Sequence, residues 1–323
     1  MNKKVFITRK IGEVAEKMLR ENNFDVNIWP KDRAMSQREI IKNLKKENYD
    51  AVLSLLTDKI DAKIFDASPA TKIFANYAAG YDNIDIAEAK KRNIIITNTP
   101  GVSGIAVAEH TFALMLALTT RLVEGDTFMR RGKYRGWAPM NFVGTDFAGK
   151  TIGLVGVGNI GSQVARMAHN GFGAKIIYTD VHPNREVEEK YGAKKCDNLE
   201  TLLREADIVS LHVPLLDSTH HLINETRLQM MKPTAFLINT SRGPVIDEKA
   251  LVRALQNKII RGAALDVFEF EPALSPSLAK LPNVILTPHI ASARESVRAE
   301  MVRLSAQSII DFFAGKTPAN KVN

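Results

Sequence analysis

Scarce cysteine, short apolar runs and dispersed charge exclude several classes of protein. The 323-residue chain has one cysteine, Cys196, which excludes an internal disulfide and any site built from several cysteines. A single thiol is typical of a reducing compartment, and we expect this one to be structural. Near the N-terminus only the short apolar run 5–7 precedes charged residues. Because no signal peptide or membrane anchor is visible there, we expect a cytoplasmic protein with no membrane partner.

The positive charge is modest and spread along the chain. The 44 basic and 36 acidic residues give a formal net charge of +8, but no run of Lys and Arg is interleaved with aromatic residues as in a nucleic-acid patch. We therefore expect no nucleic-acid partner and interpret the excess as solvated surface. A basic cleft that concentrates an anionic substrate is the alternative.

The length predicts two domains, because one hydrophobic core rarely serves 323 residues of which 45% are hydrophobic. Up to about residue 98, short β-like runs alternate with charged helical stretches, which is typical of a small α/β domain. These runs are 5–7, 26–28, 51–54, 72–75 and 94–97. Ser36 with Glu39 forms a predicted capping box, and the segment 83–85 is predicted to open a helix that runs to Arg92.

A long apolar helix is predicted from Ile105 to about Leu122. It is apolar on nearly all sides, but Glu109, His110 and several threonines interrupt it. That pattern is typical of a helix buried between domains or subunits and argues against a membrane span. We place this helix at a contact between two subunits.

From Thr151 onward, alternating strands and helices predict a doubly wound parallel sheet, so the fold class is α/β. The six strand-like runs are 151–155, 175–179, 208–211, 235–238, 263–265 and 284–286. Their near-continuous apolar character is typical of parallel strands covered on both faces. Asp247 is a predicted N-cap for a helix to about Leu255, and residues 292–313 predict a terminal helix.

A glycine loop follows the first of these runs. Gly156, Gly158 and Gly161 form a G-x-G-x-x-G pattern between a predicted strand and a predicted helix. Such glycines turn the backbone, let it touch a pyrophosphate and let the helix pack on the strand. Asp180 ends the next run, 19 residues after Gly161, where a carboxylate would accept hydrogen bonds from a ribose. The pattern predicts a dinucleotide site; a glycine-rich turn with a strand-capping aspartate is the alternative.

Polar side chains follow the last three runs, whose ends share one edge of a parallel sheet. Arg242 follows the first, Asp266 and Glu271 the second, and His289 the third. A guanidinium can bind a carboxylate through two hydrogen bonds and polarise a neighbouring ketone. An imidazolium can protonate the ketone oxygen as hydride reaches the carbon, and an adjacent carboxylate, for which Glu271 is the candidate, would favour the charged ring. A nicotinamide would supply the hydride.

Each of these residues, taken singly, has an ordinary structural interpretation as a strand-end cap, a loop acid or a structural histidine. Their joint position beside a dinucleotide loop favours function. His212 is interpreted as a wall of the cofactor pocket. The remaining histidines are interpreted as structural or solvent-facing: His110, His169, His182, His220 and His221.

At these residues the chain resembles the D-isomer-specific 2-hydroxyacid dehydrogenases, and within them the glyoxylate/hydroxypyruvate reductase branch. The resemblance covers essentially the whole length. The segments that carry it are 76–85, 98–100, the glycine loop, 239–243, 265–268 with 271–272, and 287–290.

This resemblance implies roles for individual residues. Arg242 would bind the substrate, His289 would be the acid/base and Glu271 its carboxylate partner. Backbone N–H groups of Ala79 and Gly80 would hold the substrate carboxylate. The implied cofactor-binding residues are Gly156, Gly158, Asn159, Ile160, Gly161, Asp180, His212, Val213, Pro214, Thr219, Thr240, Ser241, Arg242, Asp266, His289 and Ala291. No metal ligand is implied.

The resemblance also implies an architecture. A Rossmann NAD-binding domain would comprise residues 99–290. A smaller, flavodoxin-like substrate domain would be discontinuous and comprise residues 1–98 and 291–323. A cleft with a hinge would separate them, and family members are typically homodimers joined through their nucleotide domains.

We expect NADH-dependent reduction of a small 2-keto acid, glyoxylate or hydroxypyruvate first, to the D-2-hydroxy acid. Asp180 would repel the 2′-phosphate of NADPH, although His182 and Arg185 nearby weaken that preference. D-lactate dehydrogenase and 3-phosphoglycerate dehydrogenase are the enzymatic alternatives, and an NADH-sensing corepressor is the non-enzymatic one. Trp137 is left without an assigned role, as a candidate to reach across a dimer.

Overall fold

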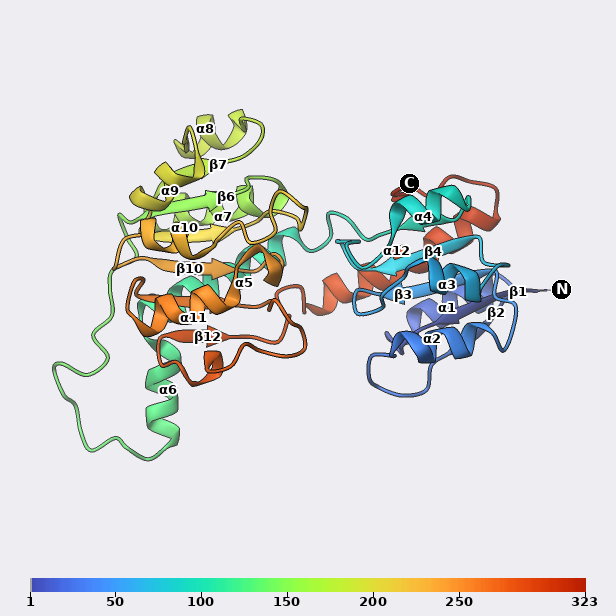
Figure 1. The fold of residues 1–323 in the computed structure, drawn as a ribbon, viewed down its shortest axis with the longest axis horizontal. Coiled ribbons are helices and arrows are strands. Elements are labelled where there is room, and N and C mark those ends of the chain that lie inside the picture. The colour runs from blue at the N-terminus through green and yellow to red at the C-terminus, as the bar shows by residue number, and fades with distance from the viewer. Residues whose placement is uncertain (1) are drawn as a thin grey trace. The chain divides into compact units, whose positions relative to one another are not determined.

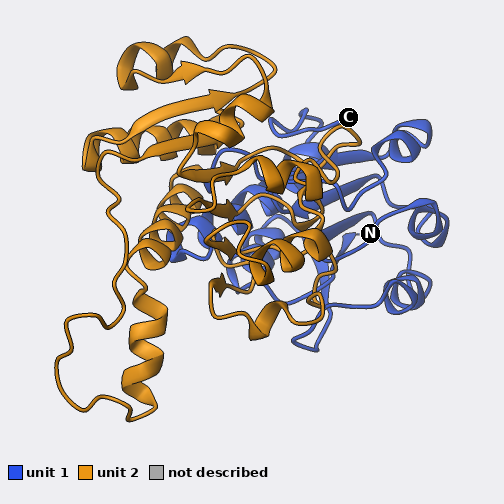
Figure 2. Cartoon of the chain, turned by 60° about the vertical axis from the view of Figure 1, so that its left-hand side comes forward, with its two compact units in different colours: residues 1–103, 293–323 blue, residues 104–292 orange. Residues whose placement is uncertain are grey.

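The computed structural model describes residues 2–323. The chain forms two compact units (Figure 2). Unit 1 comprises Met1–Ser103 and Ala293–Asn323, and unit 2 comprises Gly104–Ser292. The divisions after Ser103 and Ser292 lie a few residues beyond the domain limits suggested by the sequence.

Unit 1 is built on five parallel strands in the order β2-β1-β3-β4-β5 (Figure 1). This is the flavodoxin-like order, as predicted. Its strands are β1 Lys3–Ile7, β2 Phe24–Ile28, β3 Ala51–Leu55, β4 Ile73–Tyr77 and β5 Ile95–Thr97, and its helices are α1 Val14–Glu21, α2 Gln37–Leu44, α3 Ala62–Ala67, α4 Ile86–Lys91 and α12 Glu295–Phe313. Helix α12 packs against α1 and β4, so the C-terminal segment completes the unit that the N-terminal segment begins.

Unit 2 is built on seven parallel strands in the order β12-β11-β10-β9-β6-β7-β8. Its strands are β6 Thr151–Val155, β7 Lys175–Thr179, β8 Lys194–Lys195, β9 Ile208–Leu211, β10 Phe236–Asn239, β11 Gly262–Leu265 and β12 Val284–Leu286. Its helices are α5 Gly104–Thr119, α6 Leu122–Arg130, α7 Asn159–Phe172, α8 Arg185–Tyr191, α9 Leu199–Glu205, α10 Glu225–Met230 and α11 Glu248–Gln256. The strand order reverses between β6 and β9, which is the switch point of a doubly wound Rossmann sheet.

Both faces of the unit 2 sheet are covered by apolar side chains. Successive strand residues point to opposite faces: Val209 belongs to the core that α9, α10 and α11 cover, whereas Ile208 belongs to the core that α5 and α7 cover. This double burial explains why these strands read as apolar runs, and it confirms the predicted fold class.

Two features of unit 2 correct the sequence prediction. The sheet has a seventh strand, β8, whose two exposed lysines give no apolar signal. The predicted helix 105–122 is two helices, α5 and α6, bent by 68°. The break has local causes: the Thr119 and Thr120 hydroxyls donate to carbonyls one turn back, and Arg121 has a φ of 55°, outside the range of a right-handed helix.

Helix starts follow the predicted capping chemistry. Ser36 and Glu39 form the reciprocal capping box of α2, while Asp85 and Asp247 accept hydrogen bonds from the first turns of α4 and α11. No single helix in residues 2–323 is long and apolar enough to cross a membrane, although the bent pair α5 and α6 passes that test together on length and composition.

Candidate functional site

The polar residues predicted after the strands of unit 2 lie at one edge of its sheet. Strands β10, β11 and β12 are consecutive neighbours and parallel. Arg242, Asp266 and His289 each follow the carboxyl end of one of them. The topology thereby brings three loops that are distant in sequence to a common edge.

His289 and Glu271 form a hydrogen-bonded pair at this edge. The His289 Nδ1 atom lies 3.1 Å from Glu271 Oε2, and their side chains are 28% and 33% exposed. Phe268 donates its backbone N–H to the other oxygen, Oε1, at 2.9 Å. Because Nδ1 is engaged, the Nε2 atom of His289 is the ring nitrogen left for a ligand.

Glu271 is held in its ionised form. Burial acts to raise the pKa of this carboxyl, but the hydrogen bonds from His289 and from the Phe268 N–H, together with the positive charges of His289 and Arg242, lower it below its usual value. A permanent negative charge therefore lies against the imidazole at neutral pH.

The turn that carries Arg242 is shaped by Asn239, the last residue of β10. Its Oδ1 accepts hydrogen bonds from the Ser241 N–H and hydroxyl, and its Nδ2 donates to the carbonyl oxygen of Arg242. The next residue, Gly243, lies directly on the backbone of Phe268, where any Cβ would overlap the carbonyl group. Only glycine permits this approach, which sets the Arg242 loop against the loop of Glu271.

Asp266 organises the loop of His289. Its side chain is fully buried, and its oxygens accept hydrogen bonds from the Thr287 hydroxyl at 2.6 Å and from the N–H groups of Ile290 and Ala291 at 2.9 and 2.8 Å. Burial acts to raise the pKa of Asp266, but these hydrogen bonds and one from His110 outweigh it and lower the pKa. Both carboxylate oxygens are thus occupied by hydrogen bonds from the His289 loop.

His289 adopts a backbone conformation that needs such support. Its φ is 54°, in the left-handed region that non-glycine residues rarely occupy. The Asp266 carbonyl accepts the N–H of His289 at 2.8 Å. The carbonyl and the carboxylate of Asp266 therefore together fix the left-handed turn.

The sequence interpretation assigns His110 a structural or solvent-facing position, without naming a partner, and the structure gives it a structural role. This residue of α5 lies with Nε2 3.1 Å from Thr287 Oγ1 and 3.5 Å from Asp266 Oδ1, so it links α5 to the His289 loop. Its position within an apolar helix was the available signal, because a histidine there needs a polar partner.

The glycine loop has the geometry of an anion cradle. Gly156 has a φ of 91° and lies against the backbone of His212, and a Cβ on Gly161 would overlap the Gly156 carbonyl. Helix α7 begins with Gly158 as N-cap and has no side-chain cap, so its first N–H groups, from Asn159 and Ile160 onward, stay open to a ligand.

Asp180 lies at the end of β7, beside that loop. Its Oδ2 accepts the N–H of Val157 at 2.8 Å, and its Oδ1 accepts the N–H of His182 at 3.4 Å. The carboxylate therefore braces the glycine loop as well as presenting negative charge next to it.

His212 lies behind the glycine loop, at the end of β9. Burial lowers the pKa of its imidazole to about 4, so the ring is neutral. Its Nε2 lies 2.9 Å from Ser210 Oγ, while its Nδ1 has no partner within residues 2–323. A neutral ring in this position fits the predicted pocket wall.

The remaining predicted contacts lie in loops at the same edge. Thr219 donates its hydroxyl to the carbonyl of Pro214 at 2.6 Å and thereby closes the loop that follows Val213. Thr240 contacts Thr111 of α5 through their hydroxyl oxygens at 2.8 Å. Their side chains stabilise the loops in which they lie.

Ala79 and Gly80 belong to unit 1, in the loop after β4. Their carbonyl oxygens accept hydrogen bonds from the side chains of Asn98 and Asn76 at 2.7 and 3.1 Å. Among the described residues, their N–H groups have no acceptor. Two free backbone donors in a braced loop suit an anionic ligand.

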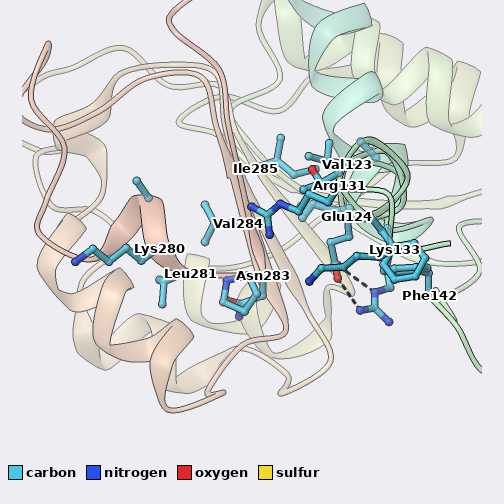
Figure 3. Close-up of a pocket in the computed structure, with 17 residues that line it drawn as sticks. Val123, Glu124, Arg131, Lys133, Phe142, Lys280, Leu281, Asn283, Val284 and Ile285 are labelled. Carbon is cyan, nitrogen blue, oxygen red and sulfur yellow. Dashed lines mark hydrogen bonds and ion pairs between the residues drawn. The ribbon is translucent and has the colours of Figure 1, made fainter.

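A separate cavity of about 490 Å³ lies at the opposite end of β12 (Figure 3). Helix α6, the chain that follows it and residues 279–285 line this cavity. Its lining contains none of the predicted site residues. In residues 2–323, no group of three or more His, Cys, Asp or Glu side chains is arranged to hold a metal ion.

Residues 112–291 match the family described as D-isomer specific 2-hydroxyacid dehydrogenase, NAD binding domain. The chain is 47% identical to the glyoxylate reductase of Thermococcus litoralis, over 100% of this chain and 97% of that protein. Among solved structures, a protein of Thermus thermophilus matches with a TM-score of 0.92, 37% identity and coverage of 99% and 100%. The NADPH-dependent glyoxylate/hydroxypyruvate reductase of Sinorhizobium meliloti, solved with NADP and malonate, matches with a TM-score of 0.88, 30% identity and coverage of 100% and 97%.

Replacing the buried Asp266 should destabilise the protein strongly. In Asp266→Asn an NH₂ group would replace one oxygen and face an N–H or O–H group that now donates to the carboxylate, so at least one buried donor would lose its acceptor. We therefore expect the free energy of unfolding at pH 7 to fall by about 2–4 kcal/mol. Urea unfolding measures it. Because the folded pKa of Asp266 is lowered, its stabilising effect is present above the unfolded pKa and is lost as pH falls through the folded pKa.

The matched control is Asp207→Asn. Asp207 also accepts a hydrogen bond from a backbone N–H, that of Thr151, but its side chain is 25% exposed. Asp207→Asn should therefore lower the free energy of unfolding by about 1 kcal/mol or less. Equal losses for the two variants would contradict the organising role of Asp266.

Proposed function

Because the chain belongs to the D-isomer-specific 2-hydroxyacid dehydrogenase family, we propose that it reduces glyoxylate or hydroxypyruvate to the D-2-hydroxy acid with NADH. Membership of this family makes the chain a nicotinamide-dependent dehydrogenase of 2-keto and 2-hydroxy acids. The observation that carries the proposed reaction is the His289–Glu271 pair, whose Nδ1 and Oε2 atoms lie 3.1 Å apart. The pair lies at the sheet edge from which the Arg242 loop also leaves.

In this proposal Arg242 binds the substrate carboxylate and polarises the keto oxygen. His289 donates the proton from Nε2 to that oxygen, and Glu271 holds the ring through Nδ1 and stabilises its charged form. The bound nicotinamide supplies the hydride. The free N–H groups of Ala79 and Gly80 are proposed as further donors to the substrate carboxylate.

The residues around the glycine loop fit a dinucleotide. The open N–H groups at the start of α7 would bind the pyrophosphate, and Asp180 would accept from the ribose hydroxyls. In this assignment unit 2 is the NAD-binding domain and unit 1 the substrate domain.

The proposed activity is tested by NADH oxidation at 340 nm with glyoxylate, hydroxypyruvate, pyruvate, phenylpyruvate and 3-phosphohydroxypyruvate. We expect the first two to give the highest kcat/KM. His289→Gln should lower kcat about 10²–10⁴-fold, because the general acid is lost, with little change in NADH binding. His169→Gln, on α7, is the control and should retain activity.

A different order of kcat/KM among these substrates would support one of the alternative functions. Preference for pyruvate would support a D-lactate dehydrogenase, and preference for the phosphorylated substrate a 3-phosphoglycerate dehydrogenase. No turnover with any of these substrates would contradict the proposal and favour the NADH-binding corepressor.

The preference for NADH is proposed from Asp180. A ribose 2′-phosphate would meet its negative charge, whereas ribose hydroxyls would find an acceptor. The reductase of Sinorhizobium meliloti is NADPH-dependent, so cofactor preference varies among similar proteins and has to be tested in this chain.

Asp180→Ala should lower kcat/KM with NADH and raise the NADPH/NADH ratio of kcat/KM at least about tenfold, an effect on the order of one lost charge interaction. Steady-state kinetics with both cofactors measure this ratio. Glu186→Ala removes a nearby exposed acid that pairs with Lys190 and is the control for net charge. An unchanged ratio in Asp180→Ala would show that Asp180 is not the cause of the preference.

A homodimer is proposed from the apolar surface of α6 and the chain that follows it. Helix α5 is mostly buried inside unit 2, so it does not supply this surface by itself. Residues after α6 form a loop that extends away from the sheet (Figure 1). Leu122, Trp137 and Met140 are 64%, 83% and 79% exposed, an amount of apolar surface that favours burial by a second copy.

The wild-type protein should have a molecular mass in solution of about twice the 35.8 kDa of one chain. Leu122→Asp combined with Met140→Asp should produce monomers, because charge would be buried in the interface. Analytical ultracentrifugation measures the mass. Val14→Asp changes an exposed apolar residue on α1 and should leave the dimer intact. A monomeric wild type would contradict the proposed dimer.

A further inference from the structure

Two glutamates join the loop of Arg242 to the loop of Glu271, and neither belongs to the predicted site. Glu248 is the first residue of α11, six positions after Arg242. Glu269 lies two positions before Glu271. Glu248 is only 2% exposed, and the side chain of Glu269 is 11% exposed. Acidic side chains are seldom so buried unless their oxygens are satisfied.

The two residues bond to each other reciprocally. The N–H of Glu248 donates to Glu269 Oε2 at 2.9 Å, and the N–H of Glu269 donates to Glu248 Oε2 at 2.9 Å. Each carboxylate therefore holds the backbone of the other residue. Bonds of this kind to an ionised acceptor are stronger than neutral ones and fix the distance between the two segments.

Two further contacts extend this arrangement. Glu248 Oε1 accepts the N–H of Ser275 at 2.6 Å, so Glu248 binds the Glu271 loop on both sides of Glu271. Glu269 Oε1 lies 2.8 Å from His221 Nε2, and the N–H of His221 donates to the carbonyl of Pro244 in the Arg242 loop. We call Glu248 and Glu269 the carboxylate clamp.

Helix capping alone does not account for the clamp. The N-cap of α11 is Asp247, which already accepts the N–H of Ala250. A glutamate in the first turn can interact favourably with the helix dipole without being buried. Glu225 occupies such a position in α10, where its side chain is 59% exposed. The buried oxygens of Glu248 instead point to the N–H groups of the loop that carries Glu271.

We propose that Glu248 and Glu269 are positioning residues that hold Glu271 at hydrogen-bond distance from His289 and fix the spacing between Glu271 and Arg242. This inference rests on the proposed function, because it gives the clamp its effect through the acid/base pair. Neither glutamate is among the residues proposed to bind substrate or cofactor.

The test compares Glu248→Gln and Glu269→Gln with wild type. In Glu248→Gln one oxygen becomes an NH₂ group that faces the N–H of Glu269 or Ser275, so the loop loses an anchor and Glu271 moves from His289. The pKa of Glu271, which His289, Arg242 and the Phe268 N–H now lower, should then rise. The acid limb of the kcat/KM profile should move to higher pH by about one unit, the scale of one lost charge-assisted hydrogen bond. In Glu269→Gln the NH₂ group can face His221 Nε2 while the amide oxygen still accepts the N–H of Glu248, so this variant should move the acid limb less.

Glu225→Gln is the matched control, since it changes the first residue of α10 in the same way and breaks an ion pair with Arg253. Its pH profile should match that of wild type. Glu271→Gln gives the limit expected when the partner of His289 loses its charge. If Glu248→Gln and Glu269→Gln lower the melting temperature but keep the wild-type pH profile, the clamp is merely structural and the proposal is overturned.

A readout without turnover separates this inference from the proposed function. The imidazole resonances of ¹⁵N-labelled protein, assigned by comparison with His289→Gln, follow the titration of His289 in each variant. A shift of that titration in Glu248→Gln but not in Glu225→Gln supports the clamp even if none of the tested 2-keto acids is reduced. An unshifted His289 titration in both clamp variants overturns the clamp even in an active reductase.

Discussion

Carboxylates that accept backbone N–H groups are the interaction on which the carboxyl edge of unit 2 depends. Loops that leave parallel strands carry N–H groups without ladder partners, and buried donors of this kind must be satisfied. Asp266, Glu248 and Glu269 accept such donors from neighbouring loops, and Asp180 does the same for the glycine loop. The side chains that would meet a ligand are therefore displayed on loops whose backbones are anchored by other acids.

This arrangement also resolves an electrostatic difficulty. Several acids lie near one edge of the sheet, and like charges placed together would each disfavour ionisation of the others. Each acid, however, has donors of its own. Burial alone would raise the pKa values of Asp266 and Glu271, yet hydrogen bonds lower both, with the charges of His289 and Arg242 adding to the effect at Glu271. The carboxyl edge of the sheet can thus carry the negative charge of Glu271 beside the imidazole of His289 without destabilising the fold.

Periodicity and local chemistry were enough to predict most of the fold. Apolar runs predicted the parallel sheet of unit 2 because strands buried on both faces need apolar residues, and short β-like runs alternating with charged helical stretches predicted an α/β fold for unit 1. Capping residues such as Ser36 and Asp247 marked helix starts because their bonds are local. The two exposed lysines of β8 carry no such signal, and a left-handed residue such as Arg121 follows from no pattern. The pairing of His289 with Glu271 was predictable from strand ends. The clamp was not, because no periodicity or motif marks two loop glutamates as buried partners. For His110 the sequence indicated the need for a polar partner but not that the partners are Thr287 and Asp266.

The left-handed backbone of His289 shows why the anchoring acids have to be rigid. A non-glycine residue at a φ of 54° costs free energy that the surrounding structure must offset. The carbonyl and carboxylate of Asp266 accept three backbone hydrogen bonds, from the N–H groups of His289, Ile290 and Ala291. The imidazole is thereby turned toward Glu271 while remaining 28% exposed. A looser anchor would let the backbone relax to an ordinary conformation and swing the ring away from Glu271, so the position of His289 depends on the hydrogen bonds that Asp266 accepts.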